Sequence, residues 1–104
     1  MPNNDPRFEI AEHYGIDIQM QQLIEEMSEL TKAICKYFRS NGKGQPIPDY
    51  TKTTVKENLI EELADVRLLL DQVVFLLDCN EEVLEVTKQK INKVFGRMGN
   101  DASN

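Results

Sequence analysis

The sequence contains no tryptophan, one histidine, two cysteines and no long uninterrupted apolar segment. The single histidine, His13, and the lack of any Cys/His ligand spacing exclude a zinc site. No run of about 18 apolar residues occurs, so we expect no membrane-spanning helix. Cys35 and Cys79 lie far apart within apolar segments, which is typical of buried, reduced thiols. Because no basic start precedes an apolar segment, we expect a cytoplasmic protein.

Basic residues are also scarce relative to acidic ones. The chain has 18 acidic and 12 basic residues and a net charge of −6. This balance argues against nucleic-acid binding, which needs clustered positive charge. It is compatible with a phosphate-bearing ligand if a metal cation screens the acidic residues. A length of 104 residues suits one modest core, so we expect a single domain over residues 1–104.

Apolar residues recur at intervals of three and four through most of the chain, and no strand-like alternation of useful length occurs. This spacing predicts an all-α protein, folded as an antiparallel bundle of about four helices. Residues 41–53 contain two glycines and two prolines and predict a loop, whereas 1–6 and 99–104 are expected to be flexible. The predicted helices cover about 7–14, 18–40, 54–78 and 81–98.

Residues typical of helix ends mark the predicted boundaries. Gly15 is expected to stop the first helix, and Asp17 to cap the second. Thr54 has a glutamate three residues later, which fits a capping box at the start of the third helix. Asp78 or Asn80 is expected to cap the last helix.

The second half of the third predicted helix is apolar nearly all round, from Leu68 to Leu77. A helix of this kind needs neighbours on more than one side. A chain with three or four helices can hardly cover it alone. We therefore expect oligomerisation to complete the bundle, as a homodimer or a homotetramer.

Two clusters of carboxylates interrupt these apolar helices. In each cluster, acids three residues apart share a helix face with apolar residues: Glu26 with Glu29, and Glu62 with Asp65. Buried like charges are costly unless a cation neutralises them, and neither cluster contains Lys or Arg. Oxygen ligands from two antiparallel helices suit a hard divalent cation, Mg²⁺ or alternatively Mn²⁺.

Such a cation suits hydrolysis of a phosphoanhydride. A metal held by carboxylates can bridge phosphate oxygens and make a water more acidic, and a further carboxylate can accept the proton. A P-loop enzyme is excluded because GxxxxGK[ST] is absent. A di-iron bundle built on Glu-x-x-His pairs is excluded because His13 lies outside both clusters. Glutamate pairs are common on surface helices, so a single cluster alone would be a weak indication.

The segments EEMSE (25–29) and ELAD (62–65) together carry a family resemblance. EExxE followed by ExxD on consecutive helices resembles the all-α nucleoside triphosphate pyrophosphohydrolase superfamily. The surrounding LIEEMSELTKAICKY, NLIEELADVRLLLDQ and KINKVFGRM are similar to its MazG-like branch. The resemblance extends over roughly residues 12 to 98.

The resemblance implies attack of water on the α-phosphorus of a (d)NTP, giving (d)NMP and pyrophosphate. It implies four Mg²⁺ ligands, namely Glu26, Glu29, Glu62 and Asp65. Two carboxylates would be catalytic, namely Glu25 and Glu29. Glu25 would either bind a second metal ion or help to orient and deprotonate the water. Three bases of the last helix would meet the triphosphate, from the same or a neighbouring subunit, namely Lys90, Lys93 and Arg97. Three residues before the motif are candidates to contact the nucleotide, with a packing role as the alternative for each: His13, Gln19 and Gln22.

Two other functions are compatible with the same sequence. One is a non-catalytic helical module that binds a nucleotide or a protein. All motif carboxylates are present, and this weighs against it, because a module without chemistry is free to lose costly buried charges. The other is pyrophosphohydrolysis of a specialised nucleotide such as phosphoribosyl-ATP.

Overall fold

The computed structural model of the protein describes residues 4–41 and 52–103. Within these ranges the chain forms four helices and no strand, so the all-α prediction is confirmed. Of the loop predicted over 41–53, residues 42–51 lie outside the described part. The helices are α1 (Pro6–Tyr14), α2 (Ile16–Ser40), α3 (Lys52–Leu76) and α4 (Asn80–Ser103).

The start of α1 is fixed by its sequence. Asp5 caps the helix by accepting a hydrogen bond from the backbone N–H of Arg7 at 3.0 Å. Pro6 takes a first-turn position, where a helix needs no N–H. The hydrogen-bonded guanidinium of Arg7 holds the pKa of the Asp5 carboxyl below its usual value. Residues 5 and 6, predicted to be flexible, therefore belong to an ordered helix start.

Gly15 is a one-residue joint between α1 and α2. Its φ of 86° lies in the left-handed region that favours glycine. Its N–H donates to the carbonyl of Ala11 at 2.8 Å and ends α1, as predicted. Because α2 begins at the next residue, Gly15 occupies the N-cap position, and Asp17 lies in the first turn instead of capping the helix. The negative charge of Asp17 still suits this end of the helix.

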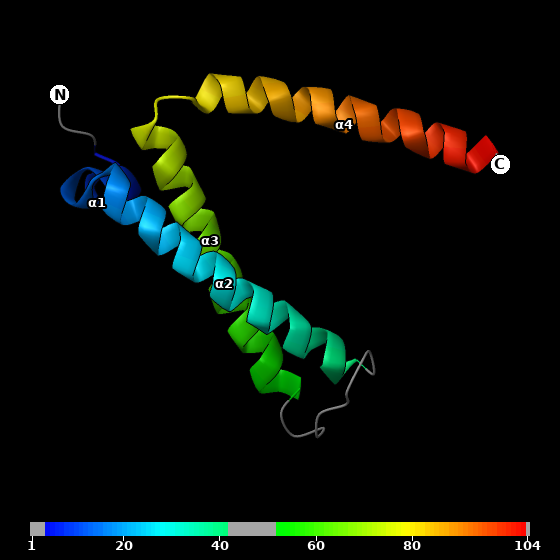
Figure 1. Ribbon diagram of the computed structural model, residues 1–104, viewed down its shortest axis with the longest axis horizontal. Coiled ribbons are helices and arrows are strands. Elements are labelled where there is room, and N and C mark those ends of the chain that lie inside the picture. Colours follow the sequence, from blue (N-terminus) through cyan, green and yellow to red (C-terminus); the bar gives the residue numbers. More distant parts are fainter. Residues whose placement is uncertain (1–3, 42–51, 104) are drawn as a thin grey trace.

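α2 and α3 lie side by side in antiparallel orientation and make the largest contact in the chain (Figure 1). α3 begins at Lys52, so Thr54 lies inside the helix and the predicted capping box is not its start. Each helix turns one row of residues, spaced by three and four, toward the other. The buried apolar members of these rows are Ala33 on α2 and Val66, Leu69 and Val73 on α3.

The hairpin leaves a second set of apolar side chains uncovered. Ile24 and Phe38 on α2 are 68% and 56% exposed, and Ile60 on α3 is 55% exposed. Cys35 is exposed and Cys79 is partly buried, so the prediction of a buried thiol is wrong for Cys35. The three packed helices therefore have a core along only part of their apolar surface.

α1 packs across the end of the hairpin where α2 begins and α3 ends (Figure 1). Phe8 stacks on Phe75 of α3 with ring centroids 4.3 Å apart. The carbonyl of Arg7 accepts a hydrogen bond from Nε2 of Gln72 at 2.9 Å. Oε1 of Gln72 in turn accepts from Nε2 of Gln19 at 2.8 Å. This buried amide relay joins α1, α2 and α3 in one polar network.

α4 projects away from the other three helices and contacts α3 near their junction (Figure 1). It begins at Asn80, directly after Cys79, so neither predicted residue occupies the position before it. Asp78 lies in the connecting turn with a φ of 50°. α4 continues to Ser103, and the C-terminal segment predicted to be flexible is helical to that residue. Within one chain, α1, α2 and α3 pack together while α4 stands apart from the predicted bundle.

We expect Gln72→Leu to lower the free energy of unfolding by about 1–3 kcal/mol, because the Nε2 of Gln19 and the carbonyl of Arg7 both lose a buried partner. Urea denaturation followed by circular dichroism measures the change. Gln21→Leu is the matched control, since Gln21 is an exposed glutamine on α2; it should shift stability by less than about 0.5 kcal/mol. Equal effects of the two substitutions would contradict a structural role for the relay.

Candidate metal centre and adjoining cavity

Three carboxylates meet at the contact between α2 and α3. Glu26 lies in the row of α2 that faces α3, and Glu62 and Asp65 come from the opposing turn of α3. One carboxylate oxygen of each lies within 4.8 Å of the others. Glu26 and Glu62 are partly buried and Asp65 is exposed. The antiparallel pairing therefore brings together three of the four predicted metal ligands.

Glu62 is the most constrained of the three carboxylates. Its Oε2 is buried and has no hydrogen-bond partner in the part of the chain that the structure describes. Burial, the neighbouring Glu26 carboxyl and the charges of Asp65 and Glu29 raise the pKa of Glu62 above its usual value. None of the ion pairs among residues 4–41 and 52–103 involves Glu26, Glu62 or Asp65. An unpaired carboxylate oxygen between two further carboxylates fits an oxygen-seeking divalent cation.

The other two predicted acids lie at the edge of this cluster. Glu29 is outside the group of three, and its carboxylate pairs with Nζ of Lys32 at 3.4 Å. Its charge nevertheless contributes to the raised pKa of Glu62. Glu25 is exposed and also lies outside the group. Both side chains are exposed, whereas those of Glu26 and Glu62 are partly buried.

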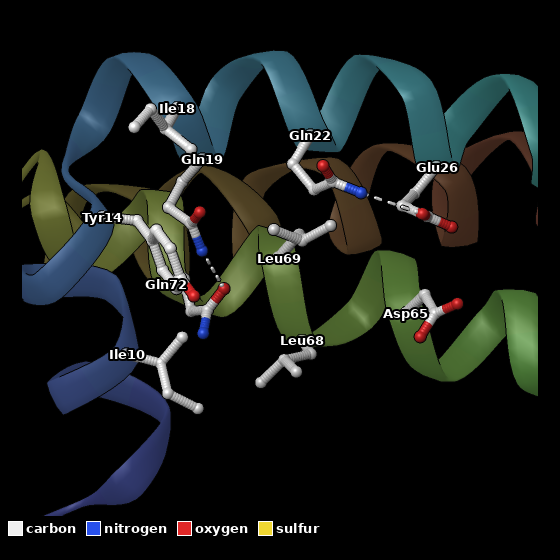
Figure 2. A pocket seen from close by; sticks show the side chains of 10 residues that line it. All are labelled: Ile10, Tyr14, Ile18, Gln19, Gln22, Glu26, Asp65, Leu68, Leu69 and Gln72. Atoms are coloured by element: carbon white, nitrogen blue, oxygen red, sulfur yellow. Dashed lines mark hydrogen bonds between the residues drawn. The ribbon is translucent and has the colours of Figure 1, made fainter.

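A cavity of about 450 Å³ opens beside two of these carboxylates, Glu26 and Asp65, whereas Glu62 does not line it. Figure 2 shows Glu26 and Asp65 at one end of it, and Tyr14 and Ile10 of α1 at the other end. Its volume lies within the range of about 300–1,000 Å³ that is usual for small-molecule sites. The cavity thus combines an acidic end with an apolar and aromatic end.

Two of the three predicted nucleotide contacts line this cavity. Gln19 is buried and belongs to the amide relay, and Gln22 donates from Nε2 to Oε1 of Glu26 at 3.0 Å (Figure 2). His13 is exposed, does not line the cavity, and packs edge-on against Tyr14 with ring centroids 4.8 Å apart. A packing role of His13 beside Tyr14 accounts for this geometry.

The predicted phosphate-binding residues lie elsewhere in the single chain. Lys90, Lys93 and Arg97 are exposed on α4, which points away from the α2–α3 hairpin (Figure 1). Within one chain, these three basic residues do not lie beside the carboxylate cluster.

Sequence reasoning missed two residues that shape the cavity, Tyr14 and Gln72. Tyr14 closes α1 directly before Gly15, and its position depends on how α1 crosses the hairpin. Asp71 and Gln72 interrupt an apolar run between Leu70 and Val73. A glutamine three residues after Leu69, on the apolar face of the predicted helix, was the available indication, because buried amides require partners.

Comparison of the chain with protein-family models, with curated proteins and with solved structures found no match. In the described residues, no helix has both the length and the apolar character that crossing a membrane requires.

We expect Glu62→Gln to raise the Tm of the protein in the presence of a chelator. Because the fold raises the pKa of Glu62, folding favours the protonated carboxyl. Stability should therefore fall as the pH rises from the unfolded-state pKa of about 4.3 through the higher folded-state pKa. The glutamine side chain does not ionise, so the variant does not lose stability in this way. The difference in Tm between the variant and the unchanged protein should therefore grow over that pH interval and then level off.

Glu61→Gln is the matched control for this measurement, since Glu61 is an exposed neighbour on the same helix. Scanning fluorimetry from pH 4 to pH 8 with a chelator should separate the two variants. Identical pH profiles for them would show that the environment of Glu62 is not special.

Proposed function

We propose that this protein is a Mg²⁺-dependent nucleoside triphosphate pyrophosphohydrolase that converts a (d)NTP and water to a (d)NMP and pyrophosphate. The observation that carries the proposal is the unpaired buried oxygen of Glu62, whose carboxylate is grouped with those of Glu26 and Asp65. Glu26 and Asp65 also line one end of a cavity of ligand size. The resemblance of the EExxE and ExxD motifs to MazG-like proteins supports the same reaction. A cytoplasmic role in removing or balancing nucleotides is consistent with this chemistry.

Glu26, Glu62 and Asp65 would hold the Mg²⁺, with Mn²⁺ as an alternative, and Glu29 would join them on leaving Lys32. When bound, the cation offsets phosphate charge and makes a nearby water more acidic. The carboxylates of the chain would fix the cation at the acidic end of the cavity. The nucleoside would then extend toward Tyr14.

The two carboxylates at the edge of the cluster would act on the attacking water. Glu25 or Glu29 would orient the attacking water and accept its proton. The water oxygen bonds to the α-phosphorus while the bond from that phosphorus to the α–β bridging oxygen breaks. The bridging oxygen leaves with pyrophosphate, and the other product is the monophosphate.

We expect Glu62→Gln to lower kcat by at least about 100-fold, because even substitutions outside the ligand shell of a metal often cost 10–100-fold. Release of pyrophosphate and monophosphate from a panel of NTPs and dNTPs, with and without Mg²⁺, measures the reaction. Glu61→Gln should keep the activity of the unchanged protein.

The product pattern separates the alternative functions. Orthophosphate as the product would mean attack on another phosphorus. Turnover of phosphoribosyl-ATP alone would favour a specialised substrate. Mg²⁺-dependent binding without turnover of any nucleotide would favour the non-catalytic module.

We also propose that the protein works as a homodimer, since one chain is too open to stand alone. Its accessible surface is 8272 Å², whereas a compact monomer of this mass exposes roughly 6,000 Å². Its radius of gyration is 18.1 Å, against about 13 Å for a compact chain of this length. The excess surface is of the size that an obligate interface removes.

The apolar face of the hairpin is the natural interface. On α2 and α3, the exposed apolar residues follow the buried row by one position, a turn of about 100°. Because the helices are antiparallel, this offset turns both stripes to the same side, opposite the cavity. The stripes consist of Met20, Ile24, Met27, Ile34 and Phe38 on α2, and of Ile60, Leu63 and Leu70 on α3.

A second copy would also bring basic residues to the acidic site. α4 leaves its own hairpin and carries an exposed apolar stripe spaced by three and four, namely Leu84, Ile91, Val94 and Met98. Packing of α4 on the other chain would place its bases near that chain's carboxylates. Lys90, Lys93 and Arg97 would then bind the triphosphate in trans.

We expect Ile24→Glu to convert the dimer to a monomer, because it buries an unpaired charge at the centre of the apolar face. Light scattering should give half the mass of the unchanged protein. Lys36→Glu is the matched control, since Lys36 lies on α2 toward the opposite face. As a second measure, the Tm of the unchanged protein should rise with protein concentration. A 12.0 kDa species at every concentration would contradict the dimer.

A further inference from the structure

The orientation of the Gln19 amide is determined by a chain of hydrogen bonds that ends at a backbone carbonyl. The carbonyl of Arg7 can only accept, so it is Nε2 of Gln72 that faces it, at 2.9 Å. Oε1 of Gln72 must then face Gln19 and accept from its Nε2, at 2.8 Å. Exchanging the oxygen and nitrogen of either glutamine would break this relay. The Oε1 of Gln19 is therefore left as an acceptor.

The orientation of Gln22 is determined in the same way at the acidic end. The carboxylate of Glu26 accepts, so Gln22 turns its Nε2 toward it at 3.0 Å. Figure 2 shows each amide nitrogen donating one N–H, from Gln22 to Glu26 and from Gln19 to Gln72. Among the described residues, no donor reaches Oε1 of either Gln19 or Gln22. Both glutamines in the cavity wall thus have acceptor oxygens free for a ligand.

Burial of the residue limits how the Gln19 amide can turn. Gln19 is only 5% exposed, so its side chain has little room to leave the relay. An acceptor held in this way gains from a ligand N–H and loses when a ligand carbonyl is placed against it. Tyr14, Ile18 and Leu68 supply flat and apolar surface around the two amides. A planar base with a donor at its edge fits these walls.

We propose that this cavity selects nucleotides whose base carries an exocyclic amino group, as cytosine and adenine do, over those with a carbonyl at the same position. The proposal rests on the proposed nucleotide function. An amino group offers two N–H donors to the oxygens of Gln19 and Gln22. Uracil, thymine and hypoxanthine instead carry a carbonyl oxygen at that position of the base. This oxygen is repelled by the Oε1 atoms of Gln19 and Gln22. The amide relay is therefore a specificity device as well as a structural link.

Binding of non-hydrolysable analogues tests the inference without turnover. The probes are the α,β-imido analogues of dCTP and dUTP, titrated with Mg²⁺ by calorimetry. We expect the cytosine analogue to bind at least about 10-fold more tightly, since a site that hydrogen-bonds a substrate group discriminates strongly against its loss. The pair dATP and dITP should show the same direction in kcat/KM.

Glutamine substitutions identify the residues responsible. Gln22→Met and Gln19→Met should each reduce the cytosine preference toward unity while circular dichroism confirms intact helicity. Gln21→Met should keep the preference, because Gln21 is exposed and does not line the cavity. Gln22→Met is the decisive variant if Gln19→Met fails to fold, since Gln22 is exposed and outside the relay.

The outcomes separate this inference from the proposed function. Equal or reversed affinities for the two analogues, with turnover of the dNTP panel intact, overturn the inference and leave the pyrophosphohydrolase standing. A cytosine preference without any turnover supports the inference and overturns the hydrolase. Failure of both analogues to bind overturns the inference together with the nucleotide site.

Discussion

The antiparallel register of α2 against α3 places carboxylates where a helical hairpin ordinarily places apolar side chains. Glu26 and Glu62 lie in the same inward rows as Ala33 and Val66. The hairpin therefore carries an unfavourable charge cluster inside its main contact. Apolar packing on either side holds this cluster in place. The pKa of Glu62 is raised because burial and the neighbouring carboxylates disfavour its charged form. Such an unfavourable cluster is typical of a functional site, because packing alone would remove it.

The cavity depends on this hairpin and on α1 together. The hairpin supplies the acidic end, while α1 supplies an apolar and aromatic end. A buried polar network is most stabilising when its members are paired. In the relay, Nε2 of Gln19 donates to Oε1 of Gln72, and Nε2 of Gln72 donates to the Arg7 carbonyl, so only the Oε1 of Gln19 remains open. The relay also explains why a glutamine occurs within the apolar part of α3. One network thus links the position of α1 to the orientation of a side chain in the cavity.

The sequence was sufficient to predict four helices and the meeting of Glu26, Glu62 and Asp65, because both follow from helical periodicity and antiparallel pairing. Helix ends were less predictable. Asp17 and Thr54 have good capping side chains, yet the helices begin earlier, since a joint and tertiary packing override local preference. The amide relay depends on contacts between distant segments, and the course of α4 on the turn around Asp78. Periodicity carries no information on either.

The joint at Gly15 has a consequence for the size of ligand that the cavity admits. α1 has nine residues, about 14 Å of helix, and it is attached at both ends. Gly15 ties it to α2, and Phe8 is stacked on α3. One additional residue between these attachments would rotate Tyr14 by about 100° and turn it away from the cavity. The length of α1 therefore acts as a fixed spacer, and chains with a longer first helix would need a different wall at this end.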